Sequence, residues 1–176
     1  MPIVLAGLLF LLAAVAEVAT SRVGATVDPD VIEATRRAAL IRVEVALARD
    51  DVTSALSAWQ EAYGLARQSR SWSGLVEAAE AHLRIGAAAN ASAAAAPRAR
   101  ELYLAALGRA RADRSVEGAL RAAEGFAGLG DHAATRLALR LAASLAARSG
   151  DGAAASRVEI ARARLLDGRT DLASRT

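Results

Sequence analysis

The side chains best suited to chemistry in this chain of 176 residues are two histidines and a few closely spaced carboxylates. A pair of carboxylates can act as general acid and base, and a histidine beside other ligands can hold a metal ion. His82 and His132 have no second ligand at metal-binding spacing, and Glu77 and Glu80 stand three positions apart, as on one exposed helix face. We therefore interpret the glutamates as solvated surface groups and His132 as a turn residue.

Motifs of nucleotide-binding enzymes and hydrolases are missing from the sequence, which contains no P-loop, G-x-G-x-x-G or G-x-S-x-G element. Cysteine is absent, and this excludes disulfides, thiolate metal sites and a cysteine nucleophile. The tripeptide Asn90-Ala91-Ser92 matches a glycosylation acceptor, but the match is too short to support glycosylation. We predict that the protein is not an enzyme and binds no cofactor or metal.

The charge pattern of the chain argues against nucleic-acid binding. The formal net charge is +3, all basic residues are arginine, and acids and bases alternate along the chain. Such interspersed charge is typical of solvated helix surfaces, and aromatic residues that could stack on bases make up only 3% of the chain. We therefore expect no nucleic-acid partner. The use of arginine without lysine indicates a GC-rich genome, and we expect a bacterial source.

The N-terminal segment is apolar, with no charge from Ile3 to Ala16. Three interpretations of residues 1–22 remain open. Residues 3–20 can form a single-pass helix that enters the lipid bilayer of the bacterial inner membrane. Alternatively, the segment is a secretory signal with a cleavage site at Ala14-Val15-Ala16. The last interpretation is an ordinary buried helix. The lack of a basic residue before the apolar core favours the anchor.

The distribution of arginines predicts on which side of the membrane the soluble domain of an anchored chain lies. Arg22, Arg36 and Arg37 follow the apolar segment, and no arginine precedes it. The positive-inside rule then favours a cytoplasmic soluble domain, with a periplasmic domain as the alternative.

The remainder of the chain predicts an all-α protein, because alanine, leucine and arginine favour helices and β-branched or aromatic residues are scarce. A linker over 23–28 precedes the helical domain, and a polar tail over 167–176 follows it. Glycine followed by aspartate at Gly130-Asp131 and Gly150-Asp151 predicts helix ends joined directly to new N-caps. The expected helices are 29–49, 51–69, 71–86, 97–113, 115–129, 131–149 and 152–166, with residues 87–96 as an extended linker or fraying turn.

A spacing of small and large residues recurs in alternate helices. The pattern A-x3-W-x2-A is followed by A-x3-Y-x2-A and by a weaker third copy, T-x3-L-x2-A. Small residues allow close helix approach, and the large residue fills the space between hairpins. We expect the following residues to pack between repeats: Ala55, Trp59, Ala62, Ala99, Tyr103, Ala106, Phe126, Gly130, Leu139 and Ala142.

This spacing resembles the second helix of the tetratricopeptide repeat (TPR), in which A-x3-F-x2-A is typical. The resemblance implies antiparallel helical hairpins stacked as a short α-solenoid, with repeats over 29–69, 71–113 and 115–149 and a capping helix over 152–166. The offsets between copies, 44 and then 36 residues, depart from the family value of about 34, and the alternative is another α-solenoid or a helical bundle. The family binds partners with the first helices of each pair, and the residues expected there are Arg42, Glu80, His82 and Arg121.

Arginines on the later helices form a second candidate surface. Arg136 and Arg140 are one turn apart, and another helix carries Arg98, Arg100, Arg109 and Arg111. They can meet anionic lipid headgroups or an acidic partner, or serve only to keep the surface soluble. The sequence as a whole predicts a membrane-anchored scaffold or accessory subunit that binds a protein partner in a membrane complex. The alternative is a cleaved, periplasmic or secreted binding module.

Overall fold

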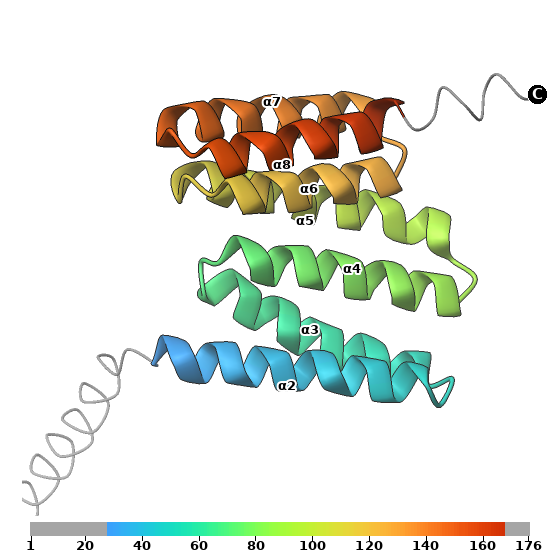
Figure 1. Ribbon diagram of the computed structural model, residues 1–176. Helices are drawn as coiled ribbons and strands as arrows, with labels where there is room; N and C mark the ends of the chain where they lie inside the picture. The colour runs from blue at the N-terminus through green and yellow to red at the C-terminus, as the bar shows by residue number, and fades with distance from the viewer. Residues whose placement is uncertain (1–27, 168–176) are drawn as a thin grey trace, which may run out of the picture. The chain divides into compact units, whose positions relative to one another are not determined.

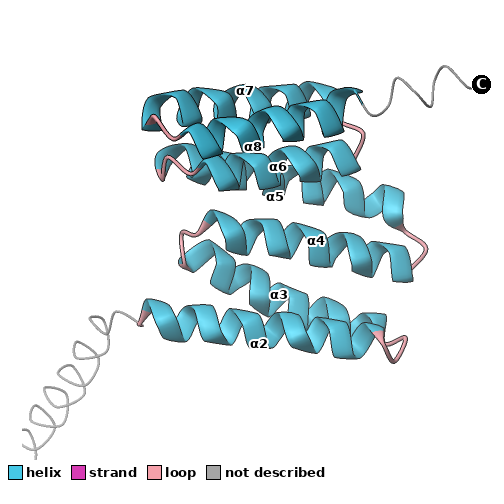
Figure 2. Cartoon of the chain, in the orientation of Figure 1, coloured by secondary structure: helices cyan, strands magenta, loops and turns pink. Residues whose placement is uncertain are grey.

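The computed structural model describes residues 28–167, and over that range it is entirely helical, with no strands (Figures 1 and 2). The prediction of an all-α protein is confirmed. The chain divides into two units between Val31 and Ile32, and the contacts between helices given below lie in the second. The elements are α2 (Pro29–Leu47), α3 (Val52–Gln68), α4 (Trp72–Ala88), α5 (Ser92–Ala112), α6 (Val116–Gly128), α7 (His132–Ser149), α8 (Gly152–Arg162) and a π-helical turn, η1 (Ala163–Asp167).

Six of these helices begin at a side-chain cap, the first, α2, at Asp28, whose Oδ1 accepts a hydrogen bond from the Asp30 N–H at 2.9 Å. Asp51, Ser71, Ser115, Asp131 and Asp151 each accept a hydrogen bond from a backbone N–H in the first turn that follows. These bonds satisfy N–H groups that have no partner inside the helix. The caps fix where each helix starts.

The connections between successive helices, α2 to α8, share one turn. The residue just before each N-cap is left-handed, with φ between 53° and 73°: Asp50, Arg70, Asn90, Arg114, Gly130 and Gly150. In four of these six turns the next N–H reaches back to the helix just ended, as from Ser115 to the Ala110 carbonyl at 2.8 Å and from Asp131 to the Phe126 carbonyl at 2.9 Å. After Arg70 and Gly150 the next N–H donates instead to the Ser69 or Ser149 hydroxyl, at 3.4 and 3.3 Å. The backbone bond is the Schellman signature, which closes a helix and reverses the chain within three residues, and all six turns keep its left-handed residue. Successive helices are therefore antiparallel neighbours.

The alanine-rich stretch after Gly86 differs from the expected linker. Helix α4 continues to Ala88, and α5 begins at Ser92, so Pro97 lies inside α5 rather than at its start. Alanine has the highest helix propensity, and this outweighs the backbone bond lost at a proline in the second turn. The fourth expected helix is thus longer at its N-terminus.

Small side chains dominate the core. Helix α4 packs most extensively on α5, and α6 on α7, with α3 against α4, α5 against α6 and α7 against α8 completing the stack. Fully buried alanines such as Ala79, Ala99, Ala123 and Ala142 allow these close approaches. Larger side chains, including Phe126, fill the spaces between helices.

The predicted membrane anchor at residues 3–20 and the polar tail lie outside the described residues. Within residues 28–167, no helix is both long and apolar enough to span a bilayer.

Candidate interaction surface

The repeated positions lie between the helices, with one exception in a turn. Ala55, Trp59 and Ala62 are buried on α3, and Ala99, Tyr103 and Ala106 occupy the corresponding positions of α5, 44 residues later. Thr135, Leu139 and Ala142 are buried on α7, as is Phe126 on α6. Gly130 is the left-handed residue of the α6–α7 turn.

The large residues of the first two copies, Trp59 and Tyr103, contact the next first helix. The Trp59 indole donates a 2.7 Å hydrogen bond to the Ala78 carbonyl of α4, and its ring lies 4.5 Å from that of His82. The Tyr103 ring meets Phe126 of α6 edge-on at 5.8 Å, and burial raises the pKa of its hydroxyl to about 12. A Cβ on Gly125 would lie 2.4 Å from the Tyr103 ring, so this position admits no side chain without movement.

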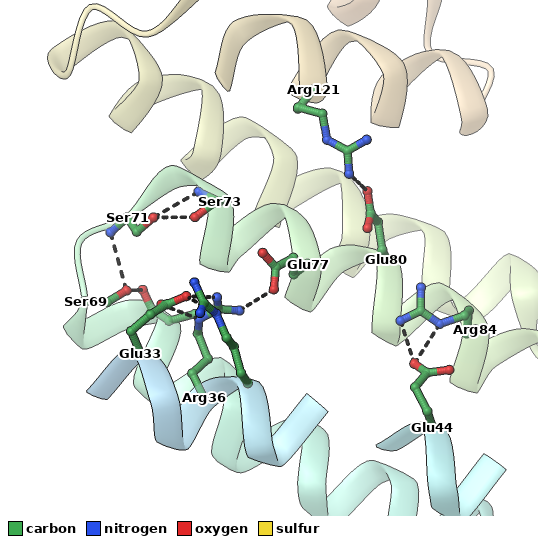
Figure 3. Close-up of polar contacts among 12 residues, drawn as sticks. Glu33, Arg36, Glu44, Ser69, Ser71, Ser73, Glu77, Glu80, Arg84 and Arg121 are labelled. Atoms are coloured by element: carbon green, nitrogen blue, oxygen red, sulfur yellow. Dashed lines mark hydrogen bonds and ion pairs between the residues drawn. The ribbon is translucent and has the colours of Figure 1, made fainter. Parts of the chain in front are cut away.

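The first helices are linked by ion pairs that run from one hairpin to the next (Figure 3). Arg36 of α2, only 1% exposed, bonds to Glu33 and to Glu77 of α4, each at 2.6 Å. Two further pairs repeat this link, Glu44 with Arg84 and Glu80 with Arg121, both at 2.7 Å. Two more ion pairs link α6 to the C-terminal helical segments: Glu117 pairs with Arg157 of α8 at 3.5 Å, and Glu124 pairs with Arg164 of η1. Charges on this face therefore neutralise each other within the chain.

The four residues expected on a partner surface are divided by this arrangement. Glu80 and Arg121 come together, but as an ion pair with each other. Arg42 is paired at 2.7 Å with Glu61 of α3. His82 is partly buried against Trp59, on the inner side of α4. The structure thus brings Glu80 and Arg121 together, whereas Arg42 contacts α3 and His82 contacts Trp59.

His82 is half-buried, and its Nδ1 atom is fully enclosed by the chain. Its Nδ1 has no hydrogen-bond partner among the described residues. Burial, followed by the positive charge of Arg98, lowers the pKa of the imidazole. The ring is therefore neutral near pH 7, and it stands 44 residues before Phe126 of α6.

The surface between the second helices α3 and α5 is closed by the chain's own side chains. The Arg98 guanidinium lies 4.9 Å from the centre of the Tyr63 ring, a cation–π contact. Arg109 of α5 donates to the Ala66 carbonyl at 2.8 Å, to Ser71 at 2.9 Å and to Arg67 at 3.2 Å. Arg109 thereby satisfies carbonyls at the C-terminal end of α3.

The corresponding surface between α5 and α7 is bridged near the start of α7 by the Arg100–Asp131 ion pair, at 2.6 Å, and is open beyond it. A groove of about 260 Å³ lies there, and two leucines on its walls remain exposed, Leu104 by 37% and Leu137 by 48%. A second hollow, of about 560 Å³, lies nearer the C-terminal ends of the same helices and is lined by Arg114, Leu145, Arg148 and Ser149. The residues lining the groove are Leu104, Leu107, Gly108, Arg111, Leu137 and Leu141.

The repeat offsets explain why one surface is closed and the other is open. With the 44-residue offset from α3 to α5, Tyr63 corresponds to Leu107. With the 36-residue offset from α5 to α7, Arg98 corresponds to Ala134 and Arg109 to Leu145. The three side chains that cover the first surface are thus replaced by smaller or apolar ones at the second.

Charge is also segregated between the two sets of helices. Helices α5 and α7 together carry seven arginines and one acid, Glu101, which is paired with Arg98. Helices α2, α4 and α6 carry seven acids and five arginines, most of them in the ion pairs above. The sequence had suggested the arginine surface but not the leucines beside it. The feature of the sequence that could have indicated the groove is the pair Leu137 and Leu141, which lie next to arginines on a helix without acids.

Among residues 28–167, no cluster of three or more histidine, cysteine or acidic side chains could hold a metal ion. A scan against protein-family models found no match, and a search of curated proteins found no similar sequence.

Proposed function

We propose that this chain is a TPR-like, non-catalytic scaffold that holds a protein partner in a bacterial membrane complex. The single observation that carries the proposal is the contrast between its surfaces. The first-helix face uses its charges within the chain, as in the Glu80–Arg121 pair, whereas the α5–α7 groove leaves leucines and arginines exposed. An exposed apolar groove with a charged rim is typical of a protein interaction site.

The anchor at residues 3–20 completes the proposal. An apolar segment joined to a repeat domain confines the groove to the membrane surface and raises its effective concentration toward a membrane-bound partner. The alternative, cleavage after Ala16, gives a free periplasmic module with the same groove. Each form has a distinct intact mass, since only the cleaved form begins at Glu17.

Site-specific photo-crosslinking in the native cell tests the proposal. A photoreactive amino acid replaces Leu137 in the groove, or Leu56 on α3 as a matched exposed leucine, 38% accessible. We expect one protein to be crosslinked from position 137 and not from 56, in the membrane fraction, to a chain of full-length mass. Equal labelling from both positions, or none from either, would contradict a partner at this groove. A soluble chain that begins at Glu17 would support the periplasmic form.

A further inference from the structure

The α5–α7 groove has a polarity along its length. Its apolar part, Leu104 with Leu137, lies toward the middle of the two helices, and Arg111 and Arg148 follow about two to three turns later. Arg114, in the turn after α5, extends the basic end. The groove and the second hollow therefore form a surface that is apolar at one end and basic at the other.

The basic end is not neutralised by the chain itself. Within residues 28–167, Arg148 bonds only to the neutral Ser144 hydroxyl, at 2.6 Å, and neither Arg111 nor Arg114 has an ion pair. Two acids lie near in sequence, and neither forms an ion pair with these three arginines. Asp151 accepts a hydrogen bond from the Ala153 N–H, capping α8. Asp113, in the turn after α5, has no side-chain ion pair within residues 28–167.

We propose that the groove binds a short amphipathic helix of the partner, with an acidic first turn followed by leucine-like side chains. This inference rests on the proposed function above and specifies the chemical character of the partner segment. The apolar side chains pack against Leu104, Leu137 and Leu141, and the acidic turn meets the three arginines. Arginine suits this role because its guanidinium can bond a carboxylate through two N–H groups.

The direction of the bound helix follows from electrostatics. The arginine end lies at the C-termini of α5 and α7, where the helix dipoles are negative. An acidic residue is most favourable in the first turn of its own helix, whose dipole is positive there. The N-terminus of the bound helix therefore lies at the arginine end, and the helix runs antiparallel to α5 and α7.

One residue in the lining of the groove is a glycine. No atom lies within 4 Å of the position that a Cβ on Gly108 would take. The chain's own packing therefore does not require glycine there, although glycine destabilises a helix interior by roughly 0.5–1 kcal/mol relative to alanine. A concave floor without a side chain accommodates a helix, whereas a bilayer surface needs no groove. This favours a peptide over lipid headgroups as the occupant.

Binding of a designed peptide tests the inference. The full-length chain is reconstituted in nanodiscs of zwitterionic lipid. The probe is a fluorescent helical peptide of about 16 residues, with three glutamates in its first turn and leucines at i, i+3, i+4 and i+7. The matched control has the same composition, with the glutamates moved to the last turn. We expect saturable binding of the first peptide, weakened at least ~10-fold in the control and weakened by added salt.

Groove variants separate the two parts of the site. Leu137→Glu and the double change Arg111→Glu, Arg148→Glu should each weaken binding ~10-fold or more. Leu56→Glu on α3 and Arg136→Glu on α7 are matched controls with an expected change below ~2-fold. Gly108→Leu fills the groove floor without altering charge and should also abolish binding. Thermal unfolding by circular dichroism verifies that each variant is folded.

Three kinds of outcome would overturn the inference. The first is equal binding of both peptides, or binding insensitive to the arginine changes. The second concerns lipid: because the chain has no cysteine, Leu104→Cys gives one labelling site for an environment-sensitive dye. A blue shift in anionic nanodiscs without peptide would assign the groove to the bilayer. A protein crosslinked at position 137 through a segment without acidic residues would refute the acidic helix and leave the scaffold proposal intact.

Discussion

The indole nitrogen of Trp59 donates a hydrogen bond of 2.7 Å to the main-chain carbonyl of Ala78, joining α3 to the middle of α4. The ring also stacks on Tyr63, with centroids 5.4 Å apart, and is 6% exposed. One side chain thus contributes both apolar burial and a buried polar contact at the same helix interface.

Trp59 substitutions should separate these two contributions. Trp59→Ala leaves a cavity and should lower the free energy of unfolding by ~3 kcal/mol, whereas Trp59→Phe loses chiefly the hydrogen bond and should cost ~1 kcal/mol. Tyr103→Ala at the corresponding position of α5 should resemble Trp59→Ala. Urea unfolding measures all three, and equal losses for Phe and Ala at position 59 would contradict this division.

Helix caps and repeat spacing explain how far the sequence could predict this fold. Ser71, Ser115, Asp131 and Asp151 are local signals because their side chains bond N–H groups two or three residues away. The start of α5 could not be placed in the same way, since Ala91 makes no side-chain cap and alanine is compatible with a helix on either side. Side-chain caps therefore made four helix starts predictable from the sequence, and the lack of a cap at Ala91 left the start of α5 unpredictable.

The candidate surface was harder to predict because it depends on contacts between residues about 40 positions apart. From the sequence alone, Glu80 and Arg121 are each expected to be a free surface charge. They form an ion pair only because α4 packs against α6. Likewise, nothing near Leu107 in sequence shows that Tyr63 fills the matching position of the previous surface. A comparison at the 44-residue offset could have revealed this difference.

His82 should make stability depend on pH. Its pKa is lowered in the folded chain, by burial and then by Arg98, so the unfolded chain binds the proton more readily. The stabilising contribution of the neutral ring is therefore present above the unfolded pKa of about 6.5 and is lost as pH falls toward the lower folded value. We expect the free energy of unfolding to be smaller at pH 5.5 than at pH 7.5.

The matched variant for this effect is His82→Phe, which introduces the residue found 44 positions later on α6. Phenylalanine removes the unpartnered Nδ1 and does not titrate, so the variant should be at least as stable at pH 7.5 and should lose the difference between the two pH values. Chemical unfolding at both pH values measures it. An unchanged pH dependence in His82→Phe would assign the effect to other groups.

Arg70 should be replaceable by glycine with a gain in stability. Its φ of 56° is unfavourable for a residue with a Cβ, whereas the same turn uses glycine at positions 130 and 150. Arg70→Gly should raise the free energy of unfolding by up to ~1 kcal/mol, and Gly130→Ala should lower it by a similar amount. Thermal and urea unfolding of the two variants provide the comparison, and a loss of stability in Arg70→Gly would show that its side chain makes a compensating contribution.

The buried Arg36 should make Glu77 more important than a comparable exposed acid. Glu77→Gln removes one of two negative partners from a guanidinium that is 1% exposed, and should cost ~1–2 kcal/mol. Glu44→Gln breaks a pair whose side chains are 51% and 48% exposed, and should cost ~0.5 kcal/mol or less. A double-mutant cycle with Arg36→Met tests whether the coupling is specific to the pair, and equal costs for the two glutamines would contradict the role of burial.

Two glycines on neighbouring helices should respond to alanine in opposite ways. In Gly125→Ala the new Cβ would lie 2.4 Å from the Tyr103 ring, so α6 must move away from α5, and we expect a loss of ~1–3 kcal/mol. Gly108→Ala and the matched Gly64→Ala meet no atom within 4 Å and should stabilise α5 and α3 by ~0.5–1 kcal/mol. Urea unfolding without any partner measures these effects. Destabilisation by Gly108→Ala would mean that the chain's own packing needs the glycine, and would remove it as a reason to expect a closely approaching helix.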